Sequence, residues 1–299
     1  MTSASPEKEA RKKSCDGICS ACAERRTCDD PRAQDSNIED RMAGIKHKIL
    51  IGSGKGGVGK STVAVNLAAA LQKRGYKVGI LDGDITGPDI PKLLGIENQK
   101  LKAGPGGLEP ADASGIKAVS MALLLKSRDS PVVWRGPMKM AALKQFVSDV
   151  NWGDLDFLLV DLPPGTSDEP LSIAQLISSL DGAVVVTTPQ EVALLDSRKA
   201  VNMFLMMKVP VLGIVENMSG LICPHCGKLI EVFKTGGGEK ASKELNVPFL
   251  GAIPMDVEIG RLGDRGVAFA GRATAAADAF EGIVNSILNK LRQNCIIDR

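Results

Sequence analysis

One glycine-rich segment constrains this chain more than any other, because it joins a short apolar run to a helical stretch. Residues 49–62 read Ile-Leu-Ile-Gly-Ser-Gly-Lys-Gly-Gly-Val-Gly-Lys-Ser-Thr and contain the pattern G-x-x-x-x-G-K-[ST] from Gly54 to Ser61. The glycines let backbone N–H groups converge on phosphate oxygens, and the helix that follows adds the positive end of its dipole. In this context the pattern predicts a phosphate-binding loop rather than an ordinary glycine-rich turn.

The loop predicts where a nucleoside triphosphate and its metal ion bind. Lys60 is expected to neutralise the β- and γ-phosphates, and the hydroxyl of Ser61 is expected to ligate Mg²⁺. The predicted nucleotide-binding residues of the loop are Gly54, Lys55, Gly56, Gly57, Val58, Gly59, Lys60, Ser61 and Thr62.

Hydrophobic patterning indicates the fold around this loop. The runs at 49–51, 78–81, 157–160, 183–187, 211–215 and 249–253 are apolar throughout, which is typical of parallel strands buried on both faces. Helical stretches at 60–74, 138–150, 169–179, 192–208 and 239–246 alternate with them. The pattern predicts an α/β fold of the P-loop NTPase type: a doubly wound, mostly parallel sheet with its ligand at the C-terminal strand ends. A hairpin or loop insertion is expected at 102–115, and a final packed helix at 275–294.

The first 45 residues differ from the rest of the chain. They are polar and charged, and they hold Cys15, Cys19, Cys22 and Cys28, four of the seven cysteines. Four thiolates this close can hold one iron–sulfur cluster or one zinc ion. We therefore predict a Cys-rich metal- or cluster-binding extension at 1–45, ahead of a P-loop ATPase domain at 46–299.

Composition excludes several other classes of function. The formal net charge is only +2, so no basic excess indicates nucleic acid or an anionic membrane as a partner. The N-terminus lacks an apolar leader, and no apolar run approaches the ~20 residues of a membrane span. We expect a cytoplasmic protein without a disulfide framework.

Acidic side chains follow two of the predicted strands. Asp82 and Asp84 come directly after the run at 78–81, which places them beside the phosphate-binding loop. Asp161 follows the run at 157–160 and leads into Leu-Pro-Pro-Gly-Thr. A helix N-cap is the other interpretation of Asp161, but two prolines after it favour a constrained functional loop.

A second cysteine motif, Cys223-Pro-His-Cys226, follows the strand at 211–215. Such a pair can be redox-active, or it can supply half of a zinc or iron–sulfur site. A two-fold dimer would complete four thiolates with one operation, and thiolate softness leaves iron–sulfur or zinc open. His225 could serve as a third ligand, but its place between the two cysteines favours a solvent-facing spacer. Cys295 is expected to be a packed thiol of the terminal helix.

Together these segments resemble the Mrp/ApbC/Nbp-type P-loop ATPases that carry iron–sulfur clusters. The matching segments are residues 54–62, 82–88, 161–166, 216–220, 223–226, 233–238 and 251–256. The stretch Lys-Gly-Gly-Val-Gly-Lys-Ser is similar to the deviant Walker A motif of MinD, ParA and the nitrogenase iron protein. The resemblance implies a homodimer, ATP hydrolysis, and a labile [4Fe–4S] cluster at the dimer interface that is passed to apo-proteins.

The resemblance also implies roles for individual residues. Lys55 would reach across the dimer to the partner's nucleotide, and Asp84 would orient the attacking water; with Lys60 these are the predicted catalytic residues. Asp82 would lie in the outer shell of Mg²⁺, and Asp161 would hold a Mg²⁺-bound water.

Three further positions enter by the same resemblance. The Gly165 amide would sense the γ-phosphate, and Asn217 would contact adenine. Cys19-x-x-Cys22-x5-Cys28 matches the last three ligands of the Nbp subgroup's N-terminal cluster, whereas Cys15 lies much closer to them than that subgroup's first ligand does.

Two other functions are compatible with the same loop. A MinD/ParA-type positioning ATPase would need a basic amphipathic end or a basic surface, but residues 291–299 offer two arginines opposed by Asp298. An electron-transfer ATPase like the nitrogenase iron protein would normally use widely separated single cysteines.

Overall fold

The computed structural model describes residues 31–104, 106–125, 127, 130, 133–223 and 225–297, with the side chains of 31–36 and 294–297 left out. Cys15, Cys19, Cys22 and Cys28 lie outside the described residues, as does the side chain of Cys295. Their predicted roles stay predictions, and so does a domain boundary at residue 45.

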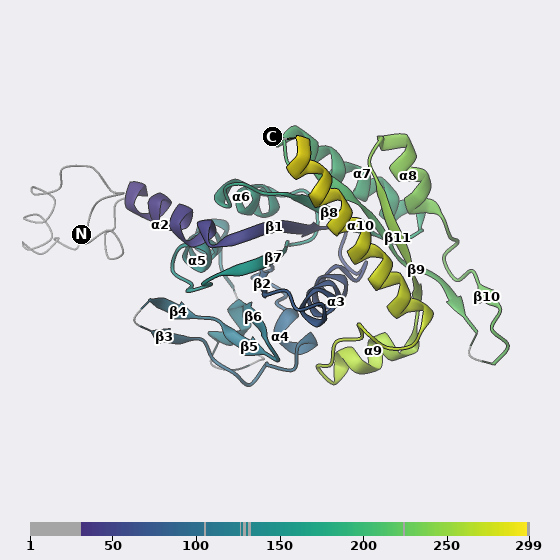
Figure 1. The fold of residues 1–299 in the computed structure, drawn as a ribbon, viewed down its shortest axis with the longest axis horizontal. Coiled ribbons are helices and arrows are strands. Elements are labelled where there is room, and N and C mark those ends of the chain that lie inside the picture. Colours follow the sequence, from purple (N-terminus) through teal and green to yellow (C-terminus); the bar gives the residue numbers. More distant parts are fainter. Residues whose placement is uncertain are drawn as a thin grey trace, which may run out of the picture.

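Nine of the described strands form one sheet, in the order β10-β9-β8-β1-β7-β2-β6-β5 with β11 beside β9 (Figure 1). The strands are β1 (Ile45–Gly52), β2 (Val78–Asp82), β5 (Ala111–Ala113), β6 (Ile116–Val119), β7 (Leu155–Asp161), β8 (Gly182–Thr187), β9 (Val211–Ile222), β10 (Leu229–Ile230) and β11 (Phe249–Met255). All pairings are parallel except β5 with β6 and β9 with β10. The predicted fold class is confirmed.

The central strands are apolar throughout because both faces of the sheet are covered. Ile49 and Ile51 of β1 belong to one hydrophobic core, whereas Leu50 between them belongs to the other. Successive side chains of a strand point to opposite faces, so one strand contributes to two cores.

Helices cover the two faces. On the first lie α3 (Lys60–Lys73), α4 (Ile90–Leu93), α9 (Val257–Asp264) and α10 (Ala275–Ile297), the yellow helix that crosses the sheet in Figure 1. On the second lie α2 (Pro31–Ala43), α5 (Gly136–Ser148), α6 (Asp168–Leu176), α7 (Glu191–Met206) and α8 (Gly237–Leu245). As predicted, α10 packs through Phe280, Val284, Ile287 and Leu291, which are buried, and Leu288, which is partly buried.

Several elements escaped prediction. The insertion does contain a hairpin, β3 (Lys102–Gly104) with β4 (Gly107–Glu109), but it continues through β5 into β6, which pairs in parallel with β2. The short 3-10 helix η3 (Met121–Leu123) follows β6. Helix α2 also lies within the polar and charged region at 1–45, where no helix was predicted. It contributes two buried side chains, Ile38 and Met42, to the second core.

Candidate functional site

The glycine-rich loop joins β1 to α3 where the parallel strands have their C-terminal ends. Gly57 and Gly59 have φ of 82° and 79°, in the left-handed region that favours glycine. Gly59 is the N-cap of α3 and no side chain caps that end, so the first amides of the helix are available to an anion. Lys55, Gly56 and Gly57 are exposed. The loop therefore has the conformation and exposure that phosphate binding requires.

Gly54 is fixed by packing rather than by its backbone conformation. A Cβ at Gly54 would overlap the backbone carbonyl of Asp196 in α7, whereas a Cβ at Gly56 would meet only Pro164, 3.9 Å away. The first glycine of the motif therefore lets the loop lie directly against a neighbouring helix.

We expect Gly54→Ala to destabilise the nucleotide-free chain by about 2 kcal/mol or more, because α7 must shift to admit the methyl group. Gly56→Ala is the matched control, since its added Cβ meets no close neighbour. Urea unfolding of the two variants measures the difference. Equal stabilities would contradict the packing role of Gly54.

Lys60, Ser61 and Asp161 form a compact charged cluster behind the loop. The Nζ of Lys60 lies 2.7 Å from Asp161 Oδ1, and the Ser61 hydroxyl donates to Asp161 Oδ2 at 2.6 Å. Burial raises the pKa of Asp161, and the charge and hydrogen bond of Lys60 oppose that rise. A hydroxyl and a carboxylate side by side are hard oxygen donors of the kind Mg²⁺ prefers, so these two residues fit the predicted magnesium site.

The two aspartates after β2 occupy different environments. Asp82 is fully buried beside Asp161 in the sheet register, and its Oδ2 accepts a 2.8 Å hydrogen bond from the Ser120 hydroxyl. Burial raises the pKa of Asp82 well above its ordinary value, with repulsion from Asp161 adding to the rise. Asp84 is half-buried, and its Oδ1 accepts from the amides of Thr86 and Gly87. Of the two, Asp84 is the carboxylate that solvent can reach, as orientation of a water molecule requires.

Ser120 is a site-lining residue that sequence reasoning missed. It follows β6, and β6 was not predicted because it has only four residues and comes directly after the glycine-rich insertion at 102–115. Only the pairing of β6 with β2 brings this hydroxyl to Asp82.

Gly165 and Asn217 also contact the loop region, though differently from their predicted roles. The amide of Gly165 donates to the Ser53 carbonyl at 2.8 Å, so it must leave that partner to reach a γ-phosphate. The Nδ2 of Asn217, on β9, donates to the Val58 carbonyl at 2.9 Å. Adenine binding by Asn217 stays a prediction, but the structure places its side chain against the loop.

The cysteine pair lies at the turn between β9 and β10, which project beyond the body of the sheet (Figure 1). Cys223 is half-buried and Cys226 is exposed. The turn is closed by backbone hydrogen bonds from Cys223 to Lys228 and from Gly227 to Cys223. His225 is exposed, as a spacer would be. The pair therefore lies on a short hairpin, on which Cys226 is open to solvent and Cys223 is partly open.

The environment of Cys223 favours the thiolate. The amides of His225 and Cys226 donate to its sulfur and lower the pKa of Cys223. We therefore expect Cys223 alkylation in the metal-free chain to be half-maximal below the ~8.5 of a free thiol. Peptide-resolved alkylation across a pH series measures this. A midpoint at or above the free-thiol value would contradict the structure.

The described residues of one chain do not complete a metal site around Cys223 and Cys226. Among the described residues, no three or more His, Cys, Asp or Glu side chains gather into a metal-binding group. Tetrahedral metal sites and cubane clusters take four ligands, and the pair supplies two.

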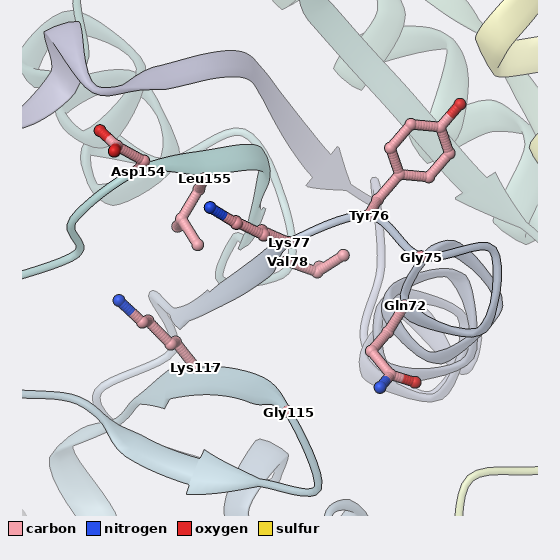
Figure 2. A pocket seen from close by; sticks show the side chains of 9 residues that line it. All are labelled: Gln72, Gly75, Tyr76, Lys77, Val78, Gly115, Lys117, Asp154 and Leu155. Carbon is pink, nitrogen blue, oxygen red and sulfur yellow. The ribbon is translucent and has the colours of Figure 1, made fainter.

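One cavity among the described residues lies away from this site. It has a volume of about 480 Å³ and lies where β2, β6 and β7 begin, at the edge opposite the glycine-rich loop (Figure 2). Its lining includes Tyr76, Lys77 and Lys117. None of the predicted nucleotide, magnesium or cysteine residues contributes to it.

Comparison with known proteins agrees with this geometry. A ParA family model described as NUBPL iron-transfer P-loop NTPase matches residues 44–288. The iron–sulfur cluster carrier protein of Methanocaldococcus jannaschii is 51% identical over 282 residues, 93% of this chain and 97% of that protein. The cytosolic Fe–S cluster assembly factor CFD1 of Saccharomyces cerevisiae is 49% identical over 222 residues, 72% of this chain and 76% of that protein.

Solved structures extend the comparison. The nucleotide-binding protein of Archaeoglobus fulgidus, in complex with ADP, is 41% identical with a TM-score of 0.70, covering 78% of this chain and 91% of that one. MinD of Pyrococcus furiosus is 24% identical with a TM-score of 0.59, covering 81% and 98%. At that identity MinD shows the shared fold alone.

Proposed function

The chain belongs to the family of NUBPL-type iron-transfer P-loop NTPases, and from this premise we propose that it is an ATP-dependent iron–sulfur cluster carrier. It acts as a cytoplasmic homodimer that binds a labile [4Fe–4S] cluster between its Cys223–Cys226 pairs and passes it to apo-proteins. The observation that carries this is a hairpin with the half-buried Cys223, which favours the thiolate, and the exposed Cys226, on the strand that contacts the phosphate-binding loop.

ATP hydrolysis depends on Lys60, Ser61 and Asp161, the group of side chains beside the phosphate-binding loop. Lys60 neutralises phosphate charge, and Ser61 and Asp161 hold the Mg²⁺, which supplies charge neutralisation on the phosphates when bound. Asp84 orients the attacking water, with Asp82 held beneath it by Ser120. Within the described residues, no hydrogen bond or ion pair engages the exposed ammonium of Lys55. That side chain is therefore available to the nucleotide of the partner subunit, where a cation stabilises charge developing in the transition state.

Exposed apolar side chains support a homodimer. Among the described residues, those with large exposed fractions near the C-terminal strand ends are Leu124, Val133, Met138, Val192, Leu195, Ile222, Leu229, Ile230, Val232 and Val257. They lie in β9 and β10, in the segments that follow β6, β8, β10 and β11, or at the start of α5. Apolar side chains concentrated at one edge indicate a protein interface, and at this edge a two-fold axis brings the cysteine pairs together.

The alternatives receive less support. The positioning-ATPase alternative rests on a fold shared with MinD at 24% identity. No helix among the described residues is both long enough and apolar enough to span a bilayer.

Anaerobic reconstitution of the full chain with iron and sulfide tests the proposal. We expect the cluster at Cys223 and Cys226 to appear with the dimer, so that native mass spectrometry finds it in dimeric species only. The same cluster content at those cysteines in a monomer would contradict a bridging site.

A further inference from the structure

Glu216 is a buried carboxylate that neither the nucleotide cluster nor the cysteine pair uses. It lies on β9 between Thr187 of β8 and Ala252 of β11, and its side chain is fully buried. Its Oε1 accepts from the Ser219 hydroxyl at 2.5 Å and from the Gly236 amide at 3.0 Å. A buried carboxylate is costly unless such donors satisfy it, so this network is specific.

The donors to Glu216 lie on both limbs of the cysteine hairpin, which we define as residues 219–223 and 225–238. Ser219 belongs to the outgoing limb, whereas Gly236 belongs to the returning limb. The other oxygen, Oε2, accepts from the Gly238 amide at 2.5 Å, in the first turn of α8. One carboxylate therefore joins the two limbs at the base of the cysteine hairpin.

The next residue on the strand connects this base to the phosphate-binding loop. Asn217 donates to the Val58 carbonyl, and a Cβ at Gly59 would overlap the Asn217 amide, so strand and loop are in direct contact. Met218 follows with φ of 58°, an uncommon backbone conformation for a residue other than glycine. The backbone of β9 thus carries a loop contact and a hairpin contact on adjacent residues.

We propose that Glu216 is a positioning residue that couples the nucleotide state of the loop to the accessibility of Cys223 and Cys226. Displacement of Val58 by a bound nucleotide moves Asn217 and with it β9. Because Glu216 joins both limbs, the cysteine hairpin follows as one body instead of bending at its base. This coupling rests on the proposed function for its purpose, but it is measurable without any cluster.

The test is peptide-resolved alkylation of Cys223 and Cys226 in the full chain without iron or cluster. The rates are measured with and without ADP and Mg²⁺. In the wild type we expect the two rates at Cys223 to differ at least about fivefold. In Glu216→Gln, which replaces one acceptor oxygen by an NH₂ group, we expect a ratio near one while ADP affinity stays close to wild type. Glu231→Gln, on the exposed returning limb, is the matched control and keeps the wild-type ratio.

A purely structural role predicts a different result. If Glu216 only stabilised the first turn of α8, its replacement would lower the unfolding midpoint. The alkylation rates with and without ADP would then change by the same factor, and their ratio would stay the same. Should Glu216→Gln fail to fold, Ser219→Ala and Gly238→Ala replace it. Ser219→Ala removes one donor, and Gly238→Ala crowds Glu216, whose Cβ would lie 3.0 Å from the added methyl.

Two outcomes overturn the proposal. In the first, ADP and Mg²⁺ leave the alkylation rate of Cys223 unchanged in the wild type. In the second, the folded Glu216 variant, or both replacement variants, show the same ratio of the two rates as the wild type. Iron and sulfide content after separate reconstitution tests the carrier function independently. A chain that takes up no cluster but loses its ratio in Glu216→Gln would contradict the carrier function and support the coupling.

Discussion

Replacing Cys223 and Cys226 together by serine is expected to remove about four iron and four sulfide ions per dimer after anaerobic reconstitution. Serine keeps the size of the side chain but loses the soft thiolate that iron requires. The fold should survive, because the hairpin is closed by backbone hydrogen bonds and Cys226 is exposed. Iron and sulfide analysis, with the visible absorption of the cluster, measures the loss.

The control for this variant is Cys295→Ser, which changes a cysteine outside both motifs and should keep the full iron and sulfide content. The N-terminal cysteines remain in both proteins, so any cluster that they hold is common to the two measurements. Equal iron content in the double variant and the control would contradict a cluster at the hairpin. A mixed dimer with one wild-type subunit should also lose the bridging cluster, since each subunit supplies two of four ligands.

Lys60→Ala is expected to lower the ATPase rate at least about 100-fold, because the cation that neutralises phosphate charge is lost. The variant also leaves the Asp161 carboxylate buried without its 2.7 Å partner, a change that typically costs ~3 kcal/mol or more. Phosphate release and urea unfolding measure the two effects. Lys46→Ala is the control, since its ion pair with Asp156 is on the surface and at the opposite end of β1.

The loss of stability in Lys60→Ala should depend on pH in a defined direction. Burial already raises the pKa of Asp161 in the folded chain, and removal of Lys60 raises it further. A folded carboxyl with a raised pKa holds its proton more tightly than the unfolded chain does. Stability is therefore lost as pH rises from the unfolded towards the folded pKa. We expect a larger destabilisation at about pH 7 than at about pH 4, which is close to the unfolded pKa, and the opposite order would contradict the buried pair.

Local patterns were sufficient for the phosphate-binding loop and most of the sheet. The loop is recognisable because its glycines, Lys60 and Ser61 all lie within residues 54–61. The central strands are recognisable because both of their faces are apolar. By contrast, β6 consists of four residues directly after a glycine-rich insertion, and the described side chains of α2 contribute Ile38 and Met42 to the core. Such short signals become elements only when partners distant in sequence supply the pairing and the packing.

The local sequence was sufficient to predict the phosphate-binding chemistry, the parallel sheet and a cysteine pair that supplies half of a metal or cluster site, since each depends on residues close together in sequence. Tertiary structure alone decided which distant groups meet: Asp161 with Lys60, Ser120 with Asp82, and Glu216 with the two limbs of the cysteine hairpin. Buried polar atoms must find partners wherever the folded backbone offers them. Strand order and register set those positions, and no local pattern records them.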